Sequence, residues 1–444
     1  MQPLIYVVPL TENRNLLYAP LHKLSALVND AVIRNWFIPS DDYEMLELQE
    51  LLSREPYASP QPRRGELTRP PFLGIVPTRG CNMSCAYCDF SLGKRTEVIS
   101  LPLIRSAIDS YSHILGEDPQ VTPSIHFFGG EPMAAASAVC YAVDTARERF
   151  GKAVHLEMTT NGYYDKETAE WAAENFDTIV LSFDGSADIQ NLHRPAPNGE
   201  DSYNTVAQSA GIFSHGKCEL IIRSCISAES APRMKAWAEL IAETYQPAAI
   251  CFEPMSESPL SLRSGLEPPE ANAFIRGWRE AFRVLRMEGI QLIFSGADLT
   301  ALQHSICPLG KDALIVTPNG KVRSCWQISE DPRCEPFDLT LGSVDAEGAH
   351  IDPSAVQRVR DLSQKNRSEC AGCFAYYHCA GGCLLNHNRA SGKDPYFCRL
   401  SRTLVLWQLL ENLGAGLLAD RLCASSAFVD ELMRQDSFLF KERE

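Results

Sequence analysis

The feature that most limits how this chain can fold is a repeated alternation of short apolar segments with segments of helical length. Six strand-like runs follow one another: FLGIVPT (72–78), SIHFFGG (124–130), AVHLEMTTN (153–161), TIVLSFD (178–184), CELIIRSCIS (218–227) and AAICFEPM (248–255). Segments such as LIRSAIDSYSHIL and KETAEWAAENF lie between them. Apolar strands that alternate with helices predict a parallel sheet covered by helices. We therefore predict an α/β fold, a partial (β/α)6 TIM-like barrel, with its functional site at the carboxyl ends of the strands.

The segments on either side of this alternation differ in character. Two strand-like runs, LIYVVPL and NLLYAPL, precede two helical patterns, HKLSALVNDAVIRNWF and DDYEMLELQELLSRE, and a linker rich in proline and charge. Further on, cysteine, glycine, asparagine and proline become dense and regular periodicity fades, until helical spacing returns from residue 401. We predict four parts: a small α+β unit (1–70), the barrel (71–298), an irregular cysteine-rich domain (299–400) and a helical tail (401–444).

Charge and hydropathy exclude some classes of partner. The formal charge of −15 and the lack of a long basic run argue against nucleic acid. The start, MQPLIYVVPLTENRN, does not have the pattern of a signal peptide. The apolar stretch TLVLWQLLENLGAGLLAD is interrupted by Glu411 and Asn412 and is too short to span a bilayer. We expect a cytoplasmic protein without a nucleic-acid or membrane partner.

Three closely spaced cysteines follow the first predicted strand. The segment GCNMSCAYCDF contains Cys81, Cys85 and Cys88. In a reducing compartment such spacing indicates a metal rather than disulfides. Structural zinc needs four protein ligands, so three thiols indicate either a zinc knuckle with a distant fourth ligand or an iron–sulfur cluster with one iron left open.

Seven further cysteines form a second group with short spacings: Cys307, Cys325, Cys370, Cys373, Cys379, Cys383 and Cys398. A zinc ribbon is the alternative interpretation of the segment CAGC…CAGGC. The other six cysteines (Cys140, Cys218, Cys225, Cys251, Cys334 and Cys423) lie mostly in apolar segments, where buried small side chains are expected.

The cysteine triplet and three motifs at the ends of successive strands together resemble the radical S-adenosylmethionine (SAM) superfamily. The motifs are FFGGEP, TTNG and LSFDG. The resemblance implies a 4Fe–4S cluster on Cys81, Cys85 and Cys88 whose open iron chelates SAM, and a 5′-deoxyadenosyl radical that abstracts a substrate hydrogen. The SAM-binding residues it implies are Tyr87 (adenine, through its backbone), Gly129, Gly130, Glu131 and Pro132 (the methionine ammonium), Asn161 and Ser182 (carboxylate). Arg194 and Arg223 are candidate cations for carboxylates, and structural or solvent-exposed roles stay equally open for both.

The later cysteines resemble the SPASM extension, which implies two auxiliary 4Fe–4S clusters. By that resemblance Cys370, Cys373, Cys379 and Cys398 ligate the outer cluster, and Cys307, Cys325 and Cys383 the inner one. The inner cluster then lacks one thiol, because Cys251 is far upstream. Either Cys334 supplies it, or the iron is open to a substrate thiol or amide.

SPASM-type relatives mostly modify peptides or proteins. The predicted function is oxidative modification of a ribosomally made peptide through a carbon–carbon, ether or thioether link, with an electron donor such as flavodoxin or ferredoxin. Residues 1–70 loosely resemble the winged-helix element that grips leader peptides. Asp184 and Glu253 are candidate bases, although Asp184 equally fits a helix cap.

Three alternatives stay open at this point. One is an anaerobic sulfatase maturase, although such enzymes often carry an aspartate where Trp326 follows Cys325. Another is a small-molecule dehydrogenase or epimerase. The third is a non-catalytic iron–sulfur carrier, for which an open iron has no use.

Overall fold

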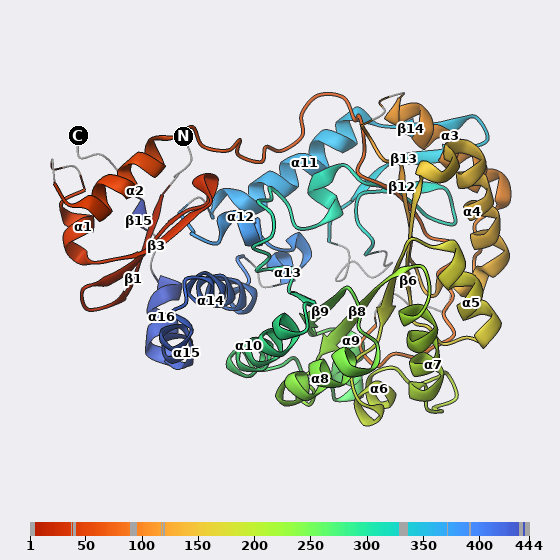
Figure 1. Ribbon diagram of the computed structural model, residues 1–444. Coiled ribbons are helices and arrows are strands. Elements are labelled where there is room, and N and C mark those ends of the chain that lie inside the picture. The colour runs from red at the N-terminus through yellow and green to blue at the C-terminus, as the bar shows by residue number, and fades with distance from the viewer. Residues whose placement is uncertain are drawn as a thin grey trace. The chain divides into compact units, whose positions relative to one another are not determined.

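The structure is a computed structural model that describes residues 5–36, 38, 41–88, 96–116, 118, 120–327, 336–370, 372–389, 392–434 and 438–439. It divides into two compact units (Figure 1). The barrel unit comprises Arg63–Phe294 and Cys307–Leu362, and the terminal unit comprises Met1–Pro62, Ser295–Ile306 and Ser363–Glu444. Each unit is assembled from separate stretches of the chain, so neither unit corresponds to one continuous segment of the sequence. The division into four domains stays a prediction.

The barrel unit is built on an 11-stranded sheet with the strand order β10-β9-β8-β7-β6-β5-β4-β11-β12-β13-β14. Its parallel strands are β4 (Leu73–Ile75), β5 (Ser124–Phe127), β6 (His155–Thr160), β7 (Thr178–Ser182), β8 (Glu219–Ile226), β9 (Ala249–Pro254) and β10 (Gln291–Ile293). The six predicted strands and the α/β class are confirmed. The short β10 was missed because three residues carry no recognisable periodicity.

Helices lie around the outside of these strands (Figure 1). They are α3 (Leu101–Leu115), α4 (Ala136–Phe150), α5 (Lys166–Asn175), α6 (Ala187–His193), α7 (Tyr203–Ser214), α8 (Met234–Thr244), α9 (Pro259–Ser264) and α10 (Ala271–Met287). In β8, Leu220, Ile222 and Ile226 are buried, whereas Arg223 between them is exposed. Alternate residues of a strand point to opposite faces, so the sheet has an apolar outer face and a second, inner face that carries polar side chains.

The expectation of an irregular segment from residue 299 is wrong over much of its length. β11 (Leu314–Val316) pairs with β4 in parallel, and β12 (Lys321–Arg323), β13 (Thr340–Asp345) and β14 (Gly348–Ile351) extend the same sheet in antiparallel fashion. Helix α11 (Pro353–Ser368) follows. Gly320, with φ 77°, makes the tight turn between β11 and β12. Strands this short give little pattern in sequence, and their pairing with β4 decides their conformation.

The terminal unit contains a four-stranded sheet with the order β15-β1-β2-β3. Its elements are β1 (Tyr6–Thr11), β2 (Arg14–Ala19), β3 (Leu24–Val28), α1 (Asp30–Arg34), α2 (Tyr43–Ser53), α12 (Tyr376–Cys379), α13 (Leu384–Arg389), α14 (Pro395–Asn412), α15 (Gly416–Ala424), α16 (Ser426–Arg434) and β15 (Phe438–Leu439). The helix at DDYEMLELQELLSRE and the helical tail are confirmed. No helix of the residues described above has the length and apolar composition needed to cross a membrane.

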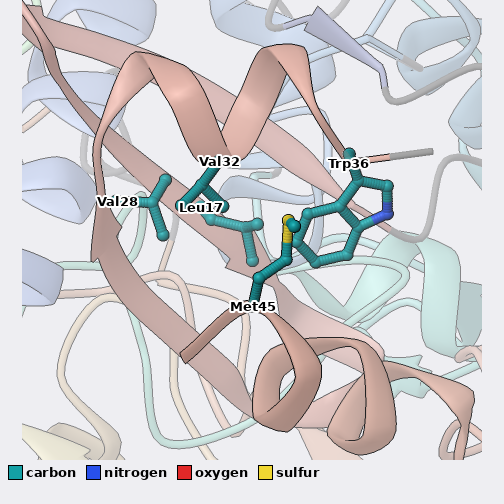
Figure 2. Packing of buried hydrophobic residues seen from close by; sticks show 5 residues of the cluster. All are labelled: Leu17, Val28, Val32, Trp36 and Met45. Carbon is teal, nitrogen blue, oxygen red and sulfur yellow. The ribbon is translucent and has the colours of Figure 1, made fainter. Parts of the chain in front are cut away.

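The helix predicted over HKLSALVNDAVIRNWF is wrong in its first half, which is strand β3 paired with β2. Asn29 ends the strand and begins α1, because its side-chain oxygen accepts hydrogen bonds from the backbone N–H groups of Ala31 and Val32. The apolar residues of this segment therefore belong to two elements, β3 and α1, whose side chains pack into the same hydrophobic cluster. Figure 2 shows that cluster, with Leu17 of β2 among Val28, Val32, Trp36 and Met45.

Candidate functional site

The cysteine triplet lies in the loop that follows β4, and neighbouring backbone holds this loop in place. The N–H of Ser84 donates to the carbonyl of Pro195 at 2.8 Å, and the N–H of Ala86 donates to the carbonyl of His193 at 2.8 Å. From the other side, the Asn82 amide donates to the carbonyl of Tyr163 at 2.6 Å. The loop is thus fixed to the segments that follow α6 and β6, which positions the thiols relative to the strand ends.

The GGEP turn after β5 lies directly against this loop. The Gly130 N–H donates to the Thr78 carbonyl at 3.1 Å, and the Glu131 N–H donates to the Gly80 carbonyl at 2.9 Å. A Cβ atom added at Gly130 would lie 2.1 Å from the Gly80 oxygen. Glycine is therefore required here so that the turn can approach the backbone of the cysteine loop. Sequence reasoning assigned these glycines to the approach of a ligand and missed this second role.

Glu131 links the turn to the end of β6. Its fully buried carboxylate accepts hydrogen bonds from the N–H of Met133 (3.0 Å), the hydroxyl of Thr160 (2.8 Å) and the N–H of Asn161 (2.8 Å). Burial raises the pKa of Glu131 to about 7, although these hydrogen bonds oppose the shift. Pro132 begins the short 3-10 helix η3 (Pro132–Ala135). The three donors give Glu131 a positioning role at the strand ends.

Asn161 continues this connection to the first thiol. Its amide nitrogen lies 2.8 Å from the Asn82 side-chain oxygen and 3.7 Å from the Cys81 sulfur. Burial and the nearby Glu131 raise the pKa of the Cys81 thiol to about 11. The ends of β5 and β6 and the cysteine loop therefore form one hydrogen-bonded assembly, and the binding of SAM by these motifs stays a prediction.

A second assembly surrounds Asp184 at the end of β7. Its Oδ2 lies 2.7 Å from the Tyr87 hydroxyl, 2.8 Å from Arg194 Nε and 3.2 Å from His193 Nδ1, and its Oδ1 accepts the backbone N–H of Cys225 at 2.9 Å. Burial opposes ionisation of this carboxyl, but Arg194 and the hydrogen bond from His193 hold its pKa below the usual range.

These contacts leave Asp184 little capacity to take up a proton near neutral pH, which argues against its role as the base. The helix-cap alternative is wrong, because the N-cap residue of α6 is Ser186. Asp184 instead holds Tyr87 and Arg194 in place, and the Arg194 guanidinium lies 5.4 Å from the centre of the Tyr87 ring. The phenol and the guanidinium therefore meet beside the cysteine loop.

The inner face near the ends of β7, β8 and β9 carries a further group of polar residues. Ser182 pairs in register with Arg223, and Arg223 with Cys251. Glu253 lies two residues further along β9, with its Oε1 3.6 Å from the Cys251 sulfur. Cys218 and Cys423 are buried, as expected, whereas Cys140 is half-buried, and so are Cys225 and Cys251 on this inner face. Their two-residue spacing from Arg223 and Glu253 was the signal that they share the inner face.

The spread of the sulfur atoms bears on which metal the cysteines fit. A tetrahedral zinc ion holds thiolates about 2.3 Å away, so their sulfurs lie roughly 3.8 Å apart. In the described part of the chain, only Asp345, Glu347 and His350 bring three ligand atoms within 4.8 Å of one another. The sulfurs of Cys81, Cys85 and Cys88 are thus more widely spread than a single zinc ion needs, and this spread fits a cluster in which each thiolate binds a different iron.

The four cysteines of the expected outer site lie together in the terminal unit. Burial raises the pKa of Cys379, and the nearby Cys373, Cys398 and Cys370 raise it further. Burial likewise raises the pKa of Cys398 to about 11, with contributions from Cys370 and Cys373. This mutual influence means that the structure brings the four thiols close to one another.

The expected inner ligands are divided between the units. Cys307 and Cys325 belong to the barrel unit and Cys383 to the terminal unit. Cys334 lies outside the described residues. The inner ligand set therefore stays a prediction.

Comparisons with known proteins agree with this geometry. Residues 75–216 match the family described as the radical SAM superfamily. The structure of anSMEcpe with bound AdoMet and the Cp18Cys peptide superposes with a TM-score of 0.61 at 18% identity, covering 79% of this chain and 99% of that one. Streptococcus suis SuiB bound to S-adenosylmethionine has a TM-score of 0.53 at 16% identity, covering 88% and 97%. SuiB bound to the precursor peptide SuiA has 0.55 at 14%, covering 89% and 98%. No curated protein matches the chain. At these identities the likeness establishes the fold.

Proposed function

We propose that this chain, which contains a radical SAM domain, uses SAM and iron–sulfur clusters to modify a ribosomally made peptide by oxidation. The observation that carries the proposal is the arrangement of the cysteine loop, which backbone hydrogen bonds from the GGEP turn hold at the carboxyl ends of the parallel strands. An open binding position at this edge suits a cofactor that completes a three-thiol cluster.

Cys81, Cys85 and Cys88 would hold this cluster, which supplies the electron that cleaves SAM when it is bound. The backbone of Gly129–Pro132 would accept the SAM ammonium, and the backbone of Tyr87 would meet the adenine. The loop shields its thiols from solvent to different degrees, because Cys85 is buried and Cys81 and Cys88 are half-buried.

The SAM carboxylate has two candidate arginines. Arg194 is already paired with Asp184 through its Nε. Arg223 is exposed on the inner face beside Ser182 and forms no hydrogen bond or ion pair with the described residues. An exposed guanidinium keeps its capacity for bidentate binding of a carboxylate. We therefore assign the carboxylate to Ser182 and Arg223, and to Arg194 a role in orienting Tyr87.

The ligands of the auxiliary clusters are assigned from the resemblance of the later cysteines to the SPASM extension. Cys370, Cys373, Cys379 and Cys398 would hold an outer 4Fe–4S cluster, and the inner cluster would use Cys307, Cys325 and Cys383. Its fourth position would be filled by Cys334 or by the substrate. Such clusters would accept the second electron of an oxidation, with a flavodoxin or ferredoxin as the donor of the first.

The peptide substrate is supported by two of the similar structures, which were determined with bound peptides. In this chain the sheet of the terminal unit is a candidate for leader-peptide binding. Helix α2 beside it exposes Tyr43 (79%) and Leu46 (47%) to solvent, and exposed apolar side chains of this kind are typical of binding surfaces.

Deleting residues 1–70 would be a poor test of leader binding, because Leu21 packs against Tyr376 and Tyr377 beside the outer cysteines. Point variants avoid this damage. Tyr43→Ser with Leu46→Ser should weaken the calorimetric affinity for the leader peptide about 30-fold, since two lost apolar contacts contribute roughly 2 kcal/mol together. Unchanged affinity would remove α2 from the binding surface.

The experiment that tests the function is anaerobic co-expression with the small peptide encoded beside the gene, followed by mass spectrometry. Loss of two hydrogens per modified site together with release of 5′-deoxyadenosine is the expected result. Formylglycine on a sulfatase peptide would favour the sulfatase maturase, and no mass change would favour epimerisation. Failure to cleave SAM with dithionite present would contradict the radical SAM assignment itself.

A further inference from the structure

A histidine and a glutamate face each other on the inner face of the barrel unit, outside all the ligand sets described above. His126 of β5 and Glu157 of β6 are directly paired in register. The His126 Nδ1 atom lies 3.3 Å from Glu157 Oε1, and the side chains are 22% and 26% exposed. Ser124 Oγ lies 2.9 Å from His126 Nε2 on the other side of the ring. The dyad is thus enclosed but still accessible.

The dyad lies on the strands that end at the cysteine loop. Glu157 precedes Asn161 by four residues, about 13 Å of extended chain. His126 likewise precedes Gly130 by four residues on β5 and its continuation. Both partners therefore lie on the inner face of the sheet, below the strand ends that carry the predicted functional site.

An aromatic column connects the dyad to Cys325. Phe72 stacks on His126 with ring centres 4.2 Å apart and on Trp326 with ring centres 5.9 Å apart, both nearly parallel. Trp326 fits because Gly74 of β4 has no side chain, since a Cβ there would lie 2.5 Å from the indole. Trp326 directly follows Cys325 and has no basic atom of its own. The ring of Phe72 thus contacts both the dyad and the residue that follows Cys325.

Packing alone does not account for a glutamate at this position. Among the described residues, neither lysine nor arginine forms an ion pair with Glu157. Placing a carboxyl in such a site without a cation carries a free-energy cost that an apolar side chain would avoid. Burial, together with the nearby Glu219, raises the pKa of Glu157 to about 7. Burial, together with the nearby His155, lowers the pKa of His126 to about 4. Near neutral pH the imidazole is therefore neutral, and the carboxyl exchanges its proton.

We propose that Glu157, held in place by His126, accepts the proton that the peptide substrate loses during its oxidation. This rests on the proposed function. With SAM and the clusters bound, the 5′-deoxyadenosyl radical would take one hydrogen atom from a substrate carbon, and an auxiliary cluster would take one electron. The proton leaves an O–H, N–H or S–H group of the substrate for the Glu157 carboxylate as the new bond forms.

The first test separates proton transfer from SAM cleavage. Glu157→Gln keeps the size of the side chain but cannot accept the proton. Modified peptide per turnover should fall about 100-fold, while 5′-deoxyadenosine release stays within about twofold of wild type. Glu229→Gln, at an exposed position, is the matched control. Wild-type yields from Glu157→Gln would overturn the proposal, whereas a wild-type enzyme that modifies no peptide would contradict the proposed function instead.

The pH profile supplies a second criterion. Because the ionised carboxylate is the acceptor, product formation should rise as the pH increases through about 7. The charged and titratable groups around the dyad are His155 on β6 and Glu219 on β8. Glu219→Gln removes a negative charge that raises the pKa of Glu157, so it should move the rise to lower pH. A rise at unchanged pH in that variant would contradict the assignment.

A third readout does not depend on activity. In the anaerobic holoenzyme with the clusters oxidised, the ring carbon resonance of His126, identified by its loss in His126→Gln, should shift as the pH passes through about 7, since its neighbour changes charge there. The shift should be absent in Glu157→Gln. Its persistence in that variant would show that another group titrates, and the dyad would be excluded.

Discussion

Tyr87 donates its phenolic hydroxyl to the carboxylate of Asp184 at 2.7 Å, which connects the cysteine loop to the end of β7. Tyr87 lies between two cluster thiols in sequence, and Asp184 is buried with a depressed pKa. This hydrogen bond therefore fixes the cysteine loop, which would hold the first cluster, relative to the end of β7. Because Arg194 shares the same carboxylate, one substitution should disturb the loop and the strand together.

Asp184→Asn should destabilise the protein by about 3–5 kcal/mol, because it leaves the buried Arg194 without its counter-charge. The folded-state pKa of Asp184 lies below the unfolded value of 3.8, so its ionised carboxylate stabilises the fold at any pH above 3.8. This stabilisation is lost as the pH falls from 3.8 through the folded-state pKa. The destabilisation should therefore be largest at neutral pH and should shrink as the pH falls below about 3.8 toward the lower folded-state pKa of Asp184. Chemical unfolding across pH measures this. Asp188→Asn, on the exposed start of α6, is the control, and an equal loss in both variants would contradict the prediction.

Gly130→Ala should reduce the iron content of the first cluster while leaving the auxiliary clusters intact. The added methyl group would lie 2.1 Å from the Gly80 oxygen and must displace the cysteine loop. Iron analysis and paramagnetic resonance of the reduced protein distinguish the clusters. Gly211→Ala in α7 has no atom within 4 Å of the added carbon and should retain full iron content. Full occupancy in Gly130→Ala would mean that the loop adapts.

Arg223→Gln should weaken SAM binding about tenfold or more, since a charge-assisted contact to a carboxylate contributes roughly 1.5–3 kcal/mol. Anaerobic calorimetry of the reconstituted enzyme measures the affinity. Arg286→Gln, on the exposed face of α10, serves as the control. If Arg223→Gln bound SAM as wild type does, the carboxylate would have to be assigned to Arg194.

Cys379→Ala should remove one auxiliary cluster and leave SAM cleavage measurable. The four thiols of the outer set raise one another's pKa values, so they share one site, and losing one ligand leaves it incomplete. Iron and sulfide content should drop by about a third if three clusters are present. Cys140→Ala, a half-buried cysteine of α4, should retain all of it. Equal iron content in the two variants would remove Cys379 from the ligand set.

The sequence by itself determined the parts of this protein whose pattern is local. Apolar runs alternating with helices predicted β4 to β9, since the apolar pattern of a buried strand can be recognised from a few consecutive residues. The cysteine spacing and the motifs after β5 and β6 predicted which strand ends meet. Only tertiary structure decided which elements share a core. Leu24–Val28 became a strand through pairing with β2, and β11 to β14 joined the barrel sheet through the pairing of β11 with β4.

The same division holds for individual side chains. Asp184 was recognisable as a polar residue at a strand end, but its low pKa comes from Arg194 and His193, which approach only when α6 folds back. His126 and Glu157 gave no signal, because their significance arises from adjacency across two parallel strands that lie 31 positions apart in sequence (157 − 126). The pKa of a side chain depends on its distances to other charged groups. Those distances are set only when the chain has folded, so local sequence does not reveal them.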